Sequence, residues 1–244
     1  MPILKKNRRY EISGDITREI EETVLKECTT EDFLENIKHQ LSMQIEYKTG
    51  VLPKGCLSYR STRELEVYVI ELPPKVLSIK FKQVRRKETE EQPEVYRLSL
   101  PFVQMYVGIQ KNSGGIQDVR LSCTKLPVQN ETDPVFVLPL PNQYSGGHEN
   151  VCTGDIRIPQ DLPISSKVKK LVEDFFTSGF NTDLSTTYPD ELRYKVNETV
   201  TLLGIAGWAK NTEENAMFGI TDTVQYQPHR HLNMDGIMGR MING

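Results

Sequence analysis

The chain has 244 residues, of which 37% are hydrophobic and 26% charged, and its 30 basic and 33 acidic side chains give a formal net charge of −3. This length suits one large domain or two small ones, and such a chain can bury a core without staples. The lack of a basic excess argues against a general nucleic-acid or acidic-membrane binder. No apolar run approaches the roughly 18 residues of a membrane span, and the basic N-terminus lacks the apolar stretch of a secretory signal. We therefore expect a cytoplasmic protein.

The cysteines narrow the kinds of site that the chain can hold. Cys28, Cys56, Cys123 and Cys152 are widely spaced and form no Cys-x-x-Cys pair. This spacing argues against a zinc ribbon or a thioredoxin-type site. In a reducing compartment, dispersed cysteines are mostly small core residues. We interpret the first three as structural, consider Cys152 separately below, and expect no metal and no cofactor.

The N-terminal part of the chain has a pattern that predicts helix from about residue 15 to residue 41. Ile16, Ile20 and Val24 recur every four positions, as on one stripe of a helix. Thr29, followed three residues later by an acid, is typical of a second capped helix start. The pattern therefore predicts two short helices, or a single helix with a frayed middle.

Alternating apolar and polar residues then predict successive strands at 64–72, 75–82, 95–109, 116–124 and 135–140. Pro73-Pro74 ends the first of them, a charged stretch at 85–94 suits a hairpin tip or an exposed loop, and Lys-Asn-Ser-Gly-Gly is a strong turn signal before 116. Short connections favour antiparallel pairing. We expect residues 65–139 to form a single antiparallel meander of about four strands.

The C-terminal half is predicted to begin with a long functional loop and then a helix. Residues 141–163 are rich in Pro, Gly and Asn without periodicity. A helix is expected at 165–178, capped by Ser165 or Ser166. It should pack on the sheet or on the N-terminal helix through an apolar face, which consists of Val168, Leu171, Val172, Phe175 and Phe176.

The last third of the chain has weaker signals. Residues 188–218 predict a helix or a short strand, with Trp208 in the core. Residues 228–244 mix Gly, Met and Asn without a period, which favours a flexible tail. His229 and His231 form a His-x-His pair that could bind a metal, but no nearby cluster of cysteines or acids supports such a site.

The stretch from Leu138 to Ile156 resembles the active-site segment of ubiquitin-conjugating enzymes. In that family the last meander strand leads into His-Pro-Asn, and a turn then leads to the catalytic cysteine. Leu-Pro-Asn at 140–142 and Val151-Cys152 occupy these places, with ten residues from Asn142 to Cys152. The chain departs from the pattern at Leu140, which replaces the histidine, and at Thr153, where a bulky residue is usual.

The resemblance is closer to a bacterial branch, prokaryotic ubiquitin-conjugating-enzyme-like family D, which includes protein B of the plasmid PRTRC system. Its pattern is similar to Pro-Asn-x-Tyr at 141–144, Val-Cys-x-Gly at 151–154 and Phe-Phe-x-Ser-x-Phe at 175–180. The His-Glu-Asn insertion at 148–150 is longer than the branch usually shows. The resemblance covers roughly residues 49–184 and implies a ubiquitin-conjugating-enzyme-like α+β fold: N-terminal helices, antiparallel meander, active-site loop and C-terminal helices.

The chemistry of such a site assigns roles to four residues. Cys152 would accept an acyl group as a thiolate, and the Asn142 amide could stabilise the oxyanion that forms when an amine attacks. His148 or Asp155 could orient or deprotonate the incoming lysine. Other interpretations stay open: Cys152 as a relic or an inert core cysteine, Asn142 as a turn former, and the other two as solvated loop or capping residues.

The resemblance implies a transferase that carries a ubiquitin-like modifier as a thioester on Cys152, in a bacterial, plasmid or phage system. Its partners would be a ThiF-type activating enzyme, the modifier and a protein target, with neither nucleic acid nor membrane. The alternative is an inactive scaffold or assembly protein on the same fold. The expected organisation is an N-terminal helical extension at 1–48, a conjugating-enzyme-like core at 49–184, a packed extension at 185–227 and a flexible tail at 228–244.

Overall fold

The chain has an α+β fold. Its structure, a computed structural model, describes residues 9–13, 16–20, 25–29, 31, 52–82, 93–140, 150–154, 156–181, 192–196 and 199–243. The chain divides into two compact units, one of residues 1–48 with 61–63 and the other of residues 49–60 with 64–244. Most of the charged stretch at 85–94, predicted as a hairpin tip or an exposed loop, lies outside the described residues, which resume at residue 93.

In the first unit, three strands form an antiparallel sheet in the order β1 (Arg9–Ser13), β2 (Ile16–Ile20) and β3 (Leu25–Thr29). The predicted helix is therefore wrong across β2 and β3. Ile16 and Ile20 are four residues apart, a spacing that fits the two-residue period of a strand as well as one turn of a helix. The β-branched residues of this segment favour the strand. Glu31 is helical, and the rest of the predicted second helix lies outside the described residues.

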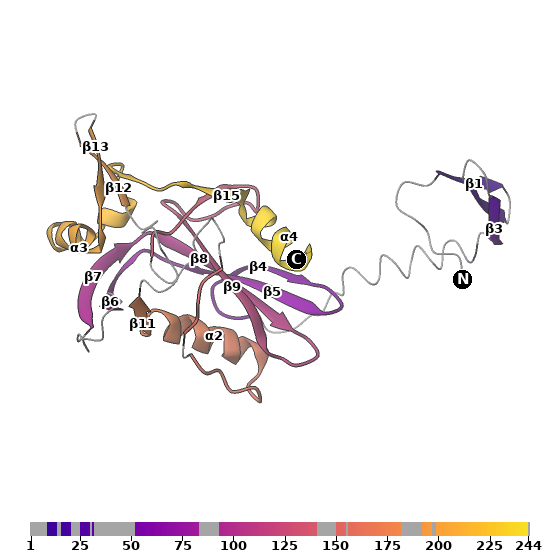
Figure 1. Cartoon of the computed structure of the whole chain (residues 1–244), viewed down its shortest axis with the longest axis horizontal. Coiled ribbons are helices and arrows are strands. Elements are labelled where there is room, and N and C mark those ends of the chain that lie inside the picture. The colour runs from indigo at the N-terminus through magenta and orange to yellow at the C-terminus, as the bar shows by residue number, and fades with distance from the viewer. Residues whose placement is uncertain are drawn as a thin grey trace, which may run out of the picture. The chain divides into compact units, whose positions relative to one another are not determined.

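A long two-stranded ladder is the centre of the second unit (Figure 1). Its elements are β5 (Leu65–Leu72), β6 (Lys75–Lys82), β7 (Glu94–Leu100) and β8 (Phe102–Gln110). Leu72 pairs with Val103, and Lys75, three residues further on, pairs with Leu100, three residues earlier. The register is therefore continuous, and β5 with β6 forms one strand of a single long hairpin.

Prolines interrupt both strands of this hairpin at the same level. The continuous register places Pro74 opposite Pro101, and neither residue has an N–H to donate to the ladder. As a result, β5 and β8 belong to a six-stranded sheet, whereas β6 and β7 form a second sheet with β11 (Gly179–Asn181), which runs parallel to β6. The predicted single meander is wrong in this respect, because Pro73-Pro74 divides one strand instead of reversing the chain.

The six-stranded sheet has the order β15–β10–β9–β8–β5–β4. The strands not yet given are β4 (Cys56–Ser61), β9 (Ile116–Thr124), β10 (Pro134–Phe136) and β15 (Pro228–Asn233). The predicted antiparallel pairing of successive strands is confirmed for β8 with β9 and for β9 with β10. β5 pairs antiparallel with β8, a partner that a simple meander does not predict. The predicted turn before β9 is also confirmed: the Gln110 N–H donates to the Gly115 carbonyl at 2.9 Å, and Gly114 has φ +65°.

One face of this sheet is covered by α2 (Ile164–Phe175), as the apolar pattern predicted (Figure 1). Phe175 is 1% exposed and lies edge-on to the rings of Phe176 and Phe180, with centroids 5.1 and 5.4 Å away. The buried Lys167 ammonium donates to the Gly114 carbonyl at 2.7 Å and ties the helix to the β8–β9 turn. The predicted serine cap is wrong, because the helix starts after Pro163 without a side-chain cap.

The opposite face is covered by α4 (Met234–Asn243), in a segment predicted to be a flexible tail. That prediction is wrong. Its buried face packs into a second core cluster against β5 and Tyr106 of β8, and consists of Met234, Ile237, Met238 and Met241. At Gly108 of β8 an added Cβ would lie 3.2 Å from Met241 Cε, so the helix approaches this strand closely. This C-terminal segment therefore supplies the strand β15 and the helix that covers one of the two faces of the sheet.

The region predicted as helix or short strand at 188–218 contains both. A small sheet has the order β13 (Thr199–Leu203), β12 (Leu192–Val196) and β14 (Val224–Gln225). The helix α3 (Ile205–Glu214) and the 3₁₀ turn η1 (Phe218–Ile220) pack against β7. Trp208 is confirmed as a core residue: it is 1% exposed, and its indole N–H donates to the Ser99 carbonyl at 3.2 Å.

Candidate functional site

The segment that carries Cys152 is hydrogen-bonded to β9. Asn150 forms an antiparallel bridge with Arg120, and the Val151 N–H donates to the Val119 carbonyl at 2.9 Å. The Val151 side chain is buried in the core cluster beneath α2, whereas Cys152, the next residue, is half-buried. A short piece of backbone thus anchors the cysteine beside β9 through one buried neighbour.

The sulfur of Cys152 accepts a hydrogen bond from the backbone. The Gly154 N–H donates to Sγ at 3.3 Å, which closes a turn of the same kind that Asp and Asn side chains make with the N–H two residues on. Gly154 has φ +56°, a conformation that glycine adopts without the steric cost paid by other residues. The Val-Cys-x-Gly pattern therefore has a local physical role, because the glycine turns the backbone so that an N–H meets the sulfur.

The other predicted catalytic residues cannot be placed beside this sulfur. Asn142, His148 and Asp155 all lie outside the described residues, so their roles stay predictions. Leu140, which stands where the family pattern has histidine, is fully buried, and its N–H donates to the Leu138 carbonyl at 2.8 Å. An apolar side chain suits this core position, and it offers no polar group to the chemistry.

The other described cysteines have different surroundings. Cys123 is fully buried in β9, and burial raises the pKa of its thiol. Cys56 is half-buried, its thiol donates to the Ser58 carbonyl at 3.2 Å, and burial again raises its pKa. All three described cysteines are free thiols. Of Cys28, only the backbone, in β3, is described.

A buried histidine, which the sequence placed in a tail, lies on β15. His229 is 1% exposed, and its Nδ1 accepts the His231 N–H at 3.2 Å. The pKa of His229 is lowered to about 4, mainly by burial and also by the nearby His231 and Arg120. Because Arg120 also pairs with Asn150, this histidine and the Cys152 segment both neighbour the same residue of β9.

The His-x-His pair does not extend into a metal site within the described part of the chain. The two rings are 5.9 Å apart between centroids. No group of three or more His, Cys, Asp or Glu side chains that could hold a metal ion occurs among the described residues. The burial of His229 was not predicted, because residues 228–244 mix Gly, Met and Asn without a period and were interpreted as a tail.

Comparison with known protein families, with characterised proteins and with solved structures finds no match to this chain. Within the described residues, no helix is both long enough and apolar enough to cross a lipid bilayer. The functional argument therefore depends on the chemistry of the residues themselves. A half-buried sulfur that is anchored beside β9 and accepts a backbone N–H is suited to nucleophilic attack on an acyl group.

Proposed function

We propose that the protein is a ubiquitin-conjugating-enzyme-like transferase that carries a ubiquitin-like modifier as a thioester on Cys152. The observation that carries the proposal is the position of this sulfur. It is half-buried, it directly follows the buried Val151 beside β9, and it accepts the Gly154 N–H at 3.3 Å. The resemblance of the surrounding Pro-Asn and Val-Cys-x-Gly patterns to conjugating enzymes supports the same assignment.

The proposed reaction has two balanced steps. First, the Cys152 thiolate attacks the thioester carbonyl that joins the modifier's C-terminus to the activating enzyme, and the bond to that enzyme's sulfur breaks. The acyl group is then joined to Cys152, and a thiolate leaves. Second, a lysine amine of the target attacks the same carbonyl, loses a proton and forms an amide, and the Cys152 thiolate is released.

The fold of this chain suits it to position the reactants, since thioester exchange makes and breaks bonds of the same kind. The anchored turn holds the sulfur in place, and a nucleophile held in position lowers the entropic part of the activation barrier. In the proposal, Asn142 donates to the oxyanion of the second step, and His148 or Asp155 accepts the lysine proton. The activating enzyme would be of the ThiF type, which supplies the modifier already as a thioester.

The direct test is to trap the adduct in the cells that naturally contain the protein. Full-length tagged protein should carry an adduct that reductant removes and that Cys152→Ala abolishes. Cys152→Ser should convert it to an oxygen ester that survives reductant but not mild base. Cys56→Ala is the matched control, since it removes another half-buried thiol and should leave the adduct intact.

A second readout measures the thiol itself. Brief iodoacetamide treatment of the folded protein, followed by mass spectrometry, should label Cys152 faster than the fully buried Cys123. If Cys152 labels no faster than Cys123, or if no reductant-sensitive adduct forms in the wild type, the transferase proposal fails. The chain is then a non-catalytic scaffold or assembly protein.

A further inference from the structure

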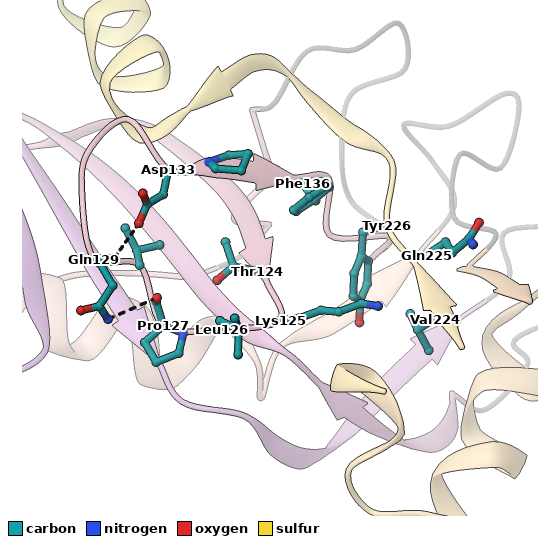
Figure 2. Close-up of a pocket in the computed structure, with 12 residues that line it drawn as sticks. Thr124, Lys125, Leu126, Pro127, Gln129, Asp133, Phe136, Val224, Gln225 and Tyr226 are labelled. Carbon is teal, nitrogen blue, oxygen red and sulfur yellow. Dashed lines mark hydrogen bonds between the residues drawn. The ribbon is translucent and has the colours of Figure 1, made fainter. Parts of the chain in front are cut away.

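A cavity of about 640 Å³ lies between the loop after β9 and the strand β14, in the second unit (Figure 2). This volume is in the range of pockets that hold small organic ligands. Its walls are mainly apolar and come from segments about 90 residues apart: Leu126, Pro127, Val128, Pro134, Phe136, Val224 and Tyr226. Leu126 at the rim is 76% exposed, which adds apolar surface at the entrance.

Most of the polar groups that line this cavity are already hydrogen-bonded within the protein. The Asp133 carboxylate accepts the N–H groups of Gln129 and Asn130 at 2.8 and 2.9 Å. The Tyr226 hydroxyl donates to the Gly219 carbonyl at 2.7 Å. The Gln129 side-chain amide donates to a backbone carbonyl. These groups shape the walls and have little capacity left for a ligand.

Lys125 is different. Its side chain is half-buried, and it makes no hydrogen bond or ion pair with any residue in the described part of the chain. Figure 2 shows it extended across the cavity toward Tyr226. The stem of such a lysine covers apolar wall, and its ammonium keeps three N–H donors that no described residue accepts. Lys125 is the only lysine or arginine among the described residues that line the cavity, and its ammonium is available to bind an anion.

We propose that this cavity binds a small amphipathic monocarboxylate, with its apolar chain or ring against Phe136 and Val224 and its carboxylate on the Lys125 ammonium. A single lysine with three N–H donors matches a singly charged carboxylate. A phosphate monoester carries more charge and is usually held by several cations or by a ring of backbone N–H groups. The site is independent of the proposed chemistry at Cys152.

The test uses titration calorimetry on the full chain with hexanoate, octanoate and octanol, all below their micelle concentrations. Octanoate should bind roughly fifteenfold more tightly than hexanoate, because two further methylenes become buried. Lys125→Gln should weaken octanoate about tenfold and leave octanol nearly unchanged, since only the charged hydrogen bond is lost. Leu126→Ala should weaken octanoate and octanol alike.

The control variant is Lys169→Gln, which removes an exposed lysine of α2 outside the cavity and should leave every affinity unchanged. Each variant is first checked for native fluorescence of the buried Trp208. The proposal is overturned if octanoate shows no saturable binding. It is also overturned if Lys125→Gln binds octanoate as tightly as the wild type, or weakens octanol to the same extent.

Discussion

We predict that His229 makes the second unit sensitive to acid. The ring is buried, its Nδ1 accepts the His231 N–H, and the proton on its Nε2 has no acceptor among the described residues. Adding a second proton would put a positive charge in a desolvated position beside His231 and Arg120, which explains the low pKa of about 4. The folded state therefore holds this histidine neutral at pH 7.

The size of this acid-dependent loss of stability follows from the difference between the pKa of His229 in the unfolded chain and in the folded protein. In the unfolded chain His229 has the ordinary histidine pKa of about 6.5, whereas in the folded protein the pKa is about 4. Above pH 6.5 neither state is protonated at this residue. As the pH falls below 6.5, the unfolded state binds the proton first and stability decreases, until the folded state also titrates near pH 4. The loss between pH 7 and pH 4 is roughly 3 kcal/mol.

Urea unfolding at pH 7 and pH 4, followed by Trp208 fluorescence, measures this loss in the unit that contains the site. The chain has one tryptophan, so the signal is unambiguous. His229→Gln should remove roughly 3 kcal/mol of the acid-dependent loss, whatever its stability at pH 7, while His231→Gln keeps that loss. Carboxylates titrate alike in all three proteins. An equal acid loss in wild type and His229→Gln would refute the reasoning.

Two further predictions concern the core. Phe175→Ala should lower the free energy of unfolding, measured in urea, by roughly 3–5 kcal/mol, since the ring is fully enclosed. Val172 is only half-buried, so Val172→Ala should lower it less. Equal losses in the two variants would contradict this packing. Gly219→Ala should cost about 3 kcal/mol, because the new Cβ would lie 2.2 Å from the Ser99 carbonyl oxygen. Gly239→Ala meets nothing within 4 Å and should be neutral or stabilising by up to about 1 kcal/mol. A Gly219→Ala variant as stable as wild type would show that this backbone contact is not tight.

The strands of the second unit were the most predictable feature of the fold, and their partners were the least. Alternation identified β5, β6 and β9 closely, because each places apolar side chains on alternate positions. Alternation does not say which strands pair. A pair of prolines between two strands suggests a turn at which the chain reverses direction. Only the continuous register shows that Pro73-Pro74 lies within one long strand.

The N-terminal error has a different origin. An apolar residue every fourth position satisfies both the strand and the helix period, so Ile16 and Ile20 carry no information about which one forms. The β-branched character of the segment was the better signal, and it favoured the strand. At the candidate site, the motif identified Cys152, and the structure adds the Gly154 N–H as its partner. His229 could not be identified, since its burial depends on strands far away in the sequence.

The C-terminal helix could have been predicted from β5. Leu65, Val67 and Val69 are apolar on one face of this strand, and Tyr68 and Ile70 on the other, so both faces need a cover. The helix at 164–175 covers only one of them.

The C-terminal segment contained the second cover. Met234, Ile237, Met238 and Met241 follow helical spacing, and Asn233 caps the start by accepting the Gly236 N–H at 2.8 Å. The glycines within this segment weakened the helical signal because each lowers helix propensity by about 1 kcal/mol. Burial of the four apolar side chains against the sheet outweighs the helix-propensity cost of these glycines. A strand that is apolar on both faces needs a covering element on each face. When only one cover is evident in the sequence, a second must be sought among segments whose own helix propensity is weak.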